Sequence, residues 1–272
     1  MARIDISGVT KIFRDPKRGA DLLTIDNVTL SVGNNDFLCL LGPSGCGKST
    51  LLNMVAGFET PTSGTVTVDG EDITAPGADR GMVFQQPTLM PWLKVWENVA
   101  FHLRLTGAPR AQRRETAQRF IDLVGLTGFE NHHPAELSGG MNQRVGIARA
   151  LLMNPRVILM DEPFGALDEQ TKMEMQTELV RIWQAHRGTI LFVTHGIDEA
   201  LTLGTHVAVM SARPGRIVEL MEIDLPRPRD ITSPDFIALK RHLLSLLRHD
   251  PPQLGGAASN PSASTPVGAI SG

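Results

Sequence analysis

The sequence has few cysteines, nearly balanced charge and no long apolar run, and each shortage excludes a class of protein. Its two cysteines, Cys39 in an apolar run and Cys46 in a glycine-rich loop, exclude a disulfide framework. The 26 Lys and Arg residues against 29 Asp and Glu residues give no strong field toward nucleic acid. No apolar run reaches the ~18 residues of a membrane span, and residues 1–5 lack the apolar character of a secretion signal. We therefore expect a soluble protein of a reducing compartment that reaches a membrane only through a partner.

Short apolar runs that alternate with helical segments predict an α/β fold with a mostly parallel sheet, covered on both faces. The runs at 37–41, 157–160 and 189–194 have the length and composition of buried strands. Residues 81–84 form a further apparent strand.

The first quarter of the chain is also rich in β-forming residues. Two runs, 3–12 and 22–32, flank a charged loop, and 65–68 alternates apolar and polar residues. The dipeptide Asp69-Gly70 that follows is a strong hairpin-turn signal.

The remaining segments differ in character from the strands. Residues 88–150 are helical in pattern, with an amphipathic stretch at 110–124, and we interpret them as an inserted helical subdomain. A C-terminal helix is predicted at 234–248, because it begins with an N-cap serine and a proline. The domain would span 1–250, and the Pro-, Gly-, Ala- and Ser-rich residues 251–272 would be a disordered tail.

A phosphate-binding loop follows the first buried strand. It reads Gly42-Pro43-Ser44-Gly45-Cys46-Gly47-Lys48-Ser49-Thr50 and matches the pattern G-x-x-x-x-G-K-[ST]. Its backbone N–H groups and the helix behind it would face phosphate oxygens. Lys48 would bridge the β- and γ-phosphates, and the Ser49 hydroxyl would bind Mg²⁺.

Two carboxylates end the apolar strand at 157–160. Because the carboxyl ends of parallel strands line the ligand crevice, Asp161 and Glu162 should face the phosphates. We assign Asp161 to Mg²⁺ and Glu162 to the general base for the attacking water, while an acidic helix cap is the alternative.

Two further polar residues follow strands. His195 ends the strand at 189–194, where it can hydrogen bond to the γ-phosphate. Gln85 follows 81–84 and can contact Mg²⁺ or the water, with the neighbouring Gln86 a competing candidate.

The next run, Leu89-Met90-Pro91-Trp92-Leu93-Lys94-Val95-Trp96, is unusually apolar for a loop. We interpret it as an exposed docking groove for a partner helix, and local packing is the alternative.

A second candidate phosphate cradle precedes the helix predicted at 141–151. Ser138, Gly139 and Gly140 combine a hydroxyl with two glycine amides at a helix start. One nucleotide held by the first loop does not need this second cradle from the same subunit, so we expect it to cap a nucleotide bound by a partner. Each motif occurs once, so the chain carries half of a two-fold ATPase.

In this order the motifs resemble those of ABC transporter ATP-binding subunits. The resemblance rests on the phosphate loop, Gln85, Leu137–Arg144, Asp161-Glu162, Gly165–Asp168 and His195, and covers residues 3–225. Finer stretches are similar to importers of taurine, aliphatic sulfonates and nitrate: 77–81, Met90-Pro91-Trp92, 97–101 and 211–216.

The resemblance implies a P-loop NTPase sheet core with an N-terminal antiparallel β subdomain and an inserted helical subdomain. It implies ATP and Mg²⁺ as ligands, and a homodimer that sandwiches each of two ATP molecules between the phosphate loop of one subunit and Ser138–Gly140 of the other. Gly165–Asp168 would cross the dimer seam. It also implies a peripheral position on the cytoplasmic face of the membrane, on two permease subunits that dock near Leu89–Trp96. A separate solute-binding protein would supply the solute indirectly.

The chain departs from the family's usual pattern in three places. Met141 stands where Gln is commonest, and Gly196 where Asp often follows the histidine. With no tyrosine in the chain, the aromatic residue that stacks on adenine would be Phe13, which fits a core position equally well.

Competing functions are the ATPase of an exporter or lipoprotein-release system, and a non-transport ABC ATPase. The second would need coiled-coil insertions, two cassettes or a basic surface, and none is evident.

Overall fold

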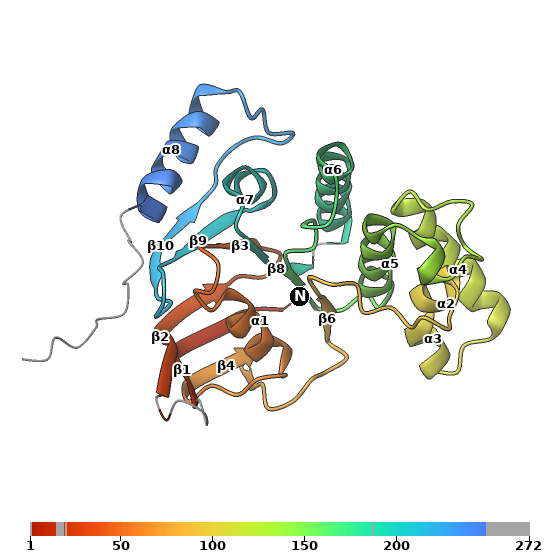
Figure 1. The fold of residues 1–272 in the computed structure, drawn as a ribbon, viewed down its shortest axis with the longest axis horizontal. Helices are drawn as coiled ribbons and strands as arrows, with labels where there is room; N and C mark the ends of the chain where they lie inside the picture. Colours follow the sequence, from red (N-terminus) through yellow and green to blue (C-terminus); the bar gives the residue numbers. More distant parts are fainter. Residues whose placement is uncertain (1, 15–18, 20, 187, 249–272) are drawn as a thin grey trace, which may run out of the picture.

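The computed structural model describes residues 2–14, 19, 21–186 and 188–248, which form two sheets with helices around them (Figure 1). The first sheet has the strand order β2 (Asp21–Val32), β1 (Ile4–Arg14), β4 (Ser63–Val68) and β5 (Glu71–Asp72), and all its pairs are antiparallel. Asp69 and Gly70 both adopt positive φ between β4 and β5, as the predicted hairpin turn requires. The expected N-terminal antiparallel sheet is therefore confirmed.

The second sheet has six strands and is mostly parallel. Its order is β10 (Ile217–Glu222), β9 (His206–Met210), β3 (Phe37–Leu41), β8 (Thr189–Thr194), β7 (Val157–Asp161) and β6 (Arg80–Val83). Only β10 runs antiparallel to its neighbour. The α/β fold class predicted from the sequence is confirmed.

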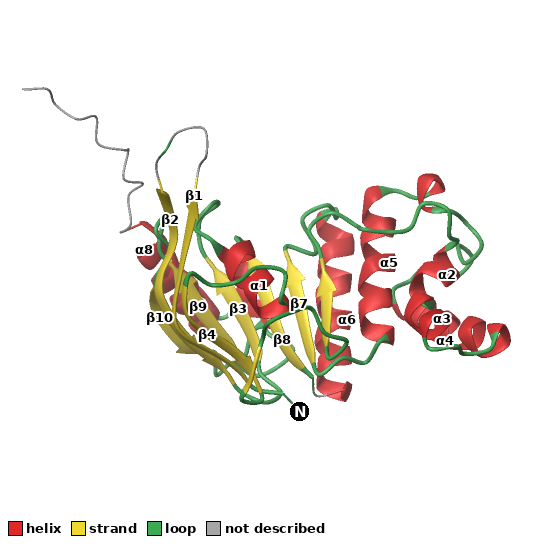
Figure 2. Cartoon of the chain, turned by 90° about the horizontal axis from the view of Figure 1, so that it is seen from below, coloured by secondary structure: helices red, strands yellow, loops and turns green. Residues whose placement is uncertain are grey.

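The central strands are buried on both faces, so their alternate residues enter two different cores. On β3, Phe37 and Cys39 pack into one core with the helices, while Leu38 and Leu40 pack into the other. Helix α1 (Lys48–Ala56) lies in this second core, between the two sheets (Figure 2). The helices of the opposite face are α5 (Gly139–Leu152), α6 (Glu169–His186), α7 (Ile197–Leu203) and α8 (Pro234–Arg248).

The segment between β6 and β7 is helical and extends to one side of the sheet (Figure 1). Residues 84–156, all of which the structure describes, contain no strand. Besides α5, this segment holds α2 (Val95–Val99), α3 (Phe101–Leu105), α4 (Arg110–Leu123) and the 3-10 turn η1 (Pro134–Glu136).

Helix α8 lies where the C-terminal helix was predicted, with Phe236 and Leu243 buried. The predicted tail at 251–272 lies outside the described residues. The parallel strands β3, β7 and β8 end at the same edge of the sheet, and this edge carries the phosphate loop, Asp161 and His195.

Candidate nucleotide-binding site

The phosphate loop connects β3 to α1 and depends on glycine at two positions. Gly45 and Gly47 have φ of 76° and 104°, which other residues rarely adopt. A Cβ on Gly47 would lie 2.9 Å from Ile25 Cγ1 on β2, so the loop also packs tightly against the antiparallel sheet. The loop conformation therefore requires these glycines.

Lys48 is a buried cation that forms no salt bridge with a carboxylate of the described residues. Its side chain is 4% exposed, and its Nζ donates to the carbonyl oxygens of Gly42 at 2.8 Å and Pro43 at 2.9 Å. Among the described residues no carboxylate forms a salt bridge with it. A buried, uncompensated ammonium group favours binding of an anion. Cys46 is buried next to it, and burial raises the pKa of the Cys46 thiol.

A cavity of about 300 Å³ lies over this loop. Its lining includes loop residues and side chains from other segments: Thr24, Ser44, Gly45, Gly47, Lys48, Ser49, Thr50, Gln85, Glu162 and Arg213. Of the two candidate glutamines, Gln85 lines the cavity and Gln86 does not. The cavity thus brings the phosphate loop together with the proposed base and the proposed sensor.

Ser49 and Asp161 form a direct pair. The Ser49 hydroxyl donates to Asp161 Oδ1 at 2.9 Å, so two oxygen atoms that suit a hard cation lie side by side. Burial raises the pKa of the Asp161 carboxyl; the charge of Glu162 reinforces this effect, while the Ser49 hydrogen bond and the charge of Lys48 oppose it. Burial therefore outweighs the compensation that Ser49 and Lys48 provide.

Glu162 and His195 form a second pair. His195 Nδ1 lies 3.1 Å from Glu162 Oε2, and the histidine side chain is 65% exposed while that of Glu162 is 20% exposed. Glu162 has φ of 44°, an unfavourable conformation for a residue with a Cβ, at a point where its side chain lines the cavity. The arrangement can orient a carboxylate toward a water molecule above the phosphate loop.

The two signature glycines have different surroundings. Ser138 Oγ accepts a hydrogen bond from Met141 N at 3.2 Å and so caps α5. A Cβ on Gly140 would lie 2.9 Å from Leu167 Cδ2, whereas one on Gly139 would meet nothing within 4 Å. Contact with Leu167 accounts for Gly140, but no contact among the described residues accounts for Gly139, which is exposed beside the exposed Ser138.

Helix α5 is also bonded to the segment around Gln85, a connection that the sequence did not predict. Gln143, 1% exposed, donates to the carbonyl oxygen of Phe84 at 2.9 Å, and Arg149 donates to that of Thr88 at 2.8 Å. Arg149 also donates to the Thr88 hydroxyl at 3.1 Å, so three side-chain hydrogen bonds join the signature helix to the segment that carries Gln85.

The apolar run Leu89–Trp96 is not one continuous exposed groove. Val95 and Trp96 belong to the buried core, with Trp96 2% exposed beneath the guanidinium groups of Arg110 and Arg114. Trp92 alone among the large residues of the run is strongly exposed, at 72%. Local packing thus explains the second half of the run, and this corrects the expected extent of the exposed surface.

Phe13 and Arg213 occupy different positions relative to the cavity. Phe13 is 36% exposed, with Lys11 Nζ 4.9 Å from its ring centroid, and it does not line the cavity. Arg213, which was not among the predicted site residues, lines the cavity and donates to the Gly45 carbonyl oxygen at 2.9 Å. Its only sequence signal was its place in the stretch 211–216.

Comparisons with known proteins identify related chains. The family model for ABC transporters matches residues 25–165. An uncharacterized ABC transporter ATP-binding protein of Methanocaldococcus jannaschii is 50% identical over 91% of this chain and 92% of its own length. The taurine import ATP-binding protein TauB of Burkholderia thailandensis is 49% identical, over 84% of this chain and 86% of its own. The nitrate import ATP-binding protein NrtD of Synechocystis sp. is 46% identical, over 90% and 95%.

A solved structure is similar across the same region. It is the dimeric structure of a post-hydrolysis state of the ATP-binding cassette MJ0796, bound to ADP and Pi. Its TM-score is 0.74 at 31% identity, and the match covers 82% of this chain and all of that one.

Proposed function

The chain belongs to the ABC transporter family of ATP-binding proteins, and on that premise we propose that it powers import of a small anion such as nitrate, taurine or another sulfonate. It is an ATP-binding and ATP-hydrolysing subunit of the importer type. The importers of nitrate and of taurine are almost equally similar to it, so the shared property of the two small solutes, an oxyanion group, defines the supported class.

The arrangement of Lys48, Ser49 and Glu162 around one cavity, with Asp161 bonded to Ser49, is the observation that supports hydrolysis at this site. Lys48, a buried cation without a salt-bridge partner among the described residues, would neutralise phosphate charge. Glu162 would accept a proton from the attacking water at its carboxylate, and His195 would keep that carboxylate in place. Gln85 would contact the water or the metal from the cavity wall.

We propose that Ser49 and Asp161 hold Mg²⁺. Their 2.9 Å hydrogen bond places two oxygen ligands together, while no group of three or more His, Cys, Asp and Glu side chains in the described chain could hold a metal ion. The remaining ligands would therefore be phosphate oxygens and water, which is usual for Mg²⁺. When bound, Mg²⁺ would neutralise charge that develops on the transferred phosphoryl group.

The proposed functional unit is a homodimer with composite nucleotide sites. Ser138 and Gly139 are exposed at the start of α5, and a glycine at 139 has no packing reason within the chain. Support comes from the similar cassette whose solved structure is dimeric. In the dimer, Ser138, Gly139 and Gly140 of one copy would cap the nucleotide that the other copy binds, and Gly165–Asp168 would lie at the seam.

We propose that two permease subunits dock around Trp92, with the solute-binding protein acting through them. None of the helices in the described part of the chain is both long and apolar enough to cross a membrane. The exposed Trp92 is the strongest candidate for an anchor, because large exposed aromatic side chains mark interfaces. Such docking would place the chain peripherally on the cytoplasmic face.

Deletion of the gene in its source organism tests the transport assignment. The deletion strain should lose uptake of one small anion, and the wild-type gene should restore it while Lys48→Ala should not. A Trp92→Ala gene should give reduced uptake although the purified variant binds ATP normally. Unchanged uptake of nitrate, taurine and other sulfonates in the deletion strain would refute the importer assignment.

A further inference from the structure

Two arginines in the segment between β10 and α8 carry positive charge that the chain does not balance. Arg227 donates to the carbonyl oxygens of Thr202 at 2.8 Å and Leu203 at 2.5 Å, and Arg229 donates to that of Gly204 at 2.6 Å. These carbonyls close α7, and a helix C-terminus carries only about half a negative charge. No carboxylate among the described residues forms a salt bridge with either arginine.

Burial lowers the pKa of both guanidinium groups, and of Arg229 the more strongly. Burial, and secondarily the charge of Arg227, lowers the pKa of the Arg229 guanidinium to about 10. Burial also lowers the pKa of Arg227. Both groups remain protonated at neutral pH, so two partly buried positive charges lie next to each other.

The two arginines line a cavity of about 690 Å³ together with Trp183, Gln184 and Thr205. The Arg227 guanidinium lies 5.4 Å from the centroid of the Trp183 ring, which fixes its position by a cation–π contact. Arg227 Nε donates to none of the described residues. The cavity wall therefore combines net positive charge with an unused N–H donor on Arg227.

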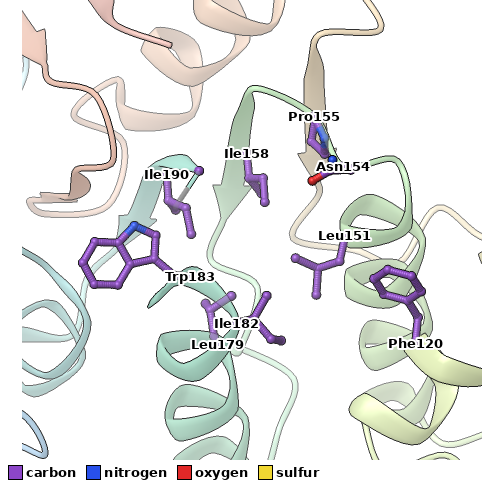
Figure 3. A pocket seen from close by; sticks show the side chains of 10 residues that line it. Phe120, Leu151, Asn154, Pro155, Ile158, Leu179, Ile182, Trp183 and Ile190 are labelled. Carbon is purple, nitrogen blue, oxygen red and sulfur yellow. The ribbon is translucent and has the colours of Figure 1, made fainter. Parts of the chain in front are cut away.

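Trp183 also separates this cavity from a smaller apolar one. The smaller cavity, about 40 Å³, has Leu179, Ile182 and Leu151 on its other sides, and the Trp183 ring lies apart from these side chains in Figure 3. No charged side chain lines that second space, so it does not suit an ion. The charged side chains lie on the arginine side of Trp183.

The arginine cavity lies at the opposite edge of the sheet from the phosphate loop. It is lined by Asn35 and Thr205, which precede β3 and β9, whereas the loop follows the end of β3. The lining residues of the two cavities have no member in common. A nucleotide on Lys48 therefore cannot supply the missing negative charge.

We propose that the cavity lined by Arg227, Arg229 and Trp183 is a second ligand site, which binds a small molecule carrying an oxyanion group. A guanidinium group suits sulfonate, sulfate, phosphate or nitrate oxygens, and the free Nε–H of Arg227 is a donor for them. The volume exceeds that of a bare ion, and the apolar side chains of Ile223 and Leu225 in the wall would accommodate a short carbon chain. The proposal does not depend on which solute is transported.

Calorimetric titration of the full chain tests this site. ADP and Mg²⁺ are kept saturating so that the phosphate loop cannot bind the probe, and ionic strength is held constant with chloride. Sulfate, nitrate, taurine and ethanesulfonate are the probes. We expect at least one of them to bind, and tighter binding of the two organic sulfonates than of sulfate would identify an organic anion as the ligand. Absence of binding by all four probes at tens of millimolar overturns the proposal.

Matched variants locate the binding. Arg227→Gln should weaken binding of the probe about tenfold or more, because a charge-assisted hydrogen-bond donor is lost. Arg181→Gln removes the same charge from the exposed surface of α6 and should leave the affinity unchanged. Equal loss in both variants would show only a general charge effect and contradict the site.

A measurement on the wild-type chain covers the case in which Arg227→Gln does not fold. The bound probe should slow amide hydrogen exchange at 201–204 and 223–230, the two segments that the arginines join. Binding without protection in these segments would place the probe elsewhere and overturn the proposal.

Discussion

His195 Nδ1 lies 3.1 Å from Glu162 Oε2, so the histidine at the end of β8 holds the carboxylate that follows β7. Because the two strands are parallel neighbours, their ends bring this pair to the same side of the phosphate loop. The contact gives Glu162 a fixed orientation despite its unfavourable backbone conformation.

We expect Glu162→Gln to lower ATP hydrolysis by roughly 10²- to 10⁴-fold while ATP binding is retained, because the amide cannot accept the proton from water. Steady-state phosphate release and equilibrium binding of ATP measure the two properties separately. Glu174→Gln, a change on the surface of α6, serves as the control and should keep normal turnover. Normal turnover in Glu162→Gln would refute the assigned base.

Asp161→Asn should stabilise the protein without ligand at neutral pH and abolish Mg²⁺-dependent hydrolysis. Burial raises the pKa of Asp161 in the folded state, so the ionised carboxylate disfavours folding above that pKa. The protonated Asp161 carboxyl contributes fully to the free energy of unfolding below the pKa that it has in the unfolded chain. This contribution is lost as pH rises through its higher pKa in the folded protein. Thermal unfolding from mildly acidic to neutral pH checks this, and a destabilised Asp161→Asn at neutral pH would contradict it.

The two signature glycines should respond differently to alanine. Gly139→Ala meets no atom within 4 Å, so stability should be kept, yet hydrolysis should fall roughly 100-fold because the methyl group would misplace the partner's nucleotide. Gly140→Ala would press on Leu167 and should cost about 1 kcal/mol of unfolding free energy. Denaturant unfolding and phosphate release distinguish them, and full activity in a stable Gly139→Ala would remove the argument for a composite site.

Asn98 should be essential to the shape of the segment around Trp92. It is buried, accepts from Met90 N and donates to the carbonyl oxygens of Met90 and Leu93. Asn98→Ala should therefore cost about 2–4 kcal/mol, measured by denaturant unfolding. Asn131→Ala, at an exposed position, should change stability by less than about 0.5 kcal/mol, and a similar loss in both variants would argue against a specific role for Asn98.

The sequence predicted the elements whose signal is local. The apolar run at 157–160 ends in two carboxylates, and the glycine loop follows the run at 37–41, so parallel pairing alone brings both to one sheet edge. The hairpin at Asp69-Gly70 was equally predictable from its turn residues. Strands β9 and β10 were not predicted, although His206–Met210 pairs with β3 in the centre of the sheet.

Contacts between distant segments could not be predicted. Trp96 is buried in the helical core, and α4 places Arg110 and Arg114 over its ring, which no local pattern indicates. In the sequence Gln143 resembles an ordinary polar residue of a helix. Its hydrogen bond to the carbonyl oxygen of Phe84, directly after β6, forms only in the folded chain. Arg227 and Arg229 lie in a proline-containing segment that carries no strand or helix signal, and their cavity exists only in the folded chain.

The dependence of specific ATPase activity on protein concentration tests the proposed two-copy site most directly. With Mg²⁺ and saturating ATP, activity per chain should rise with concentration and follow the dimer fraction measured by sedimentation, because Ser138 and Gly139 of one copy complete the site of the other. Constant activity per chain at concentrations where sedimentation detects only monomer would contradict the account.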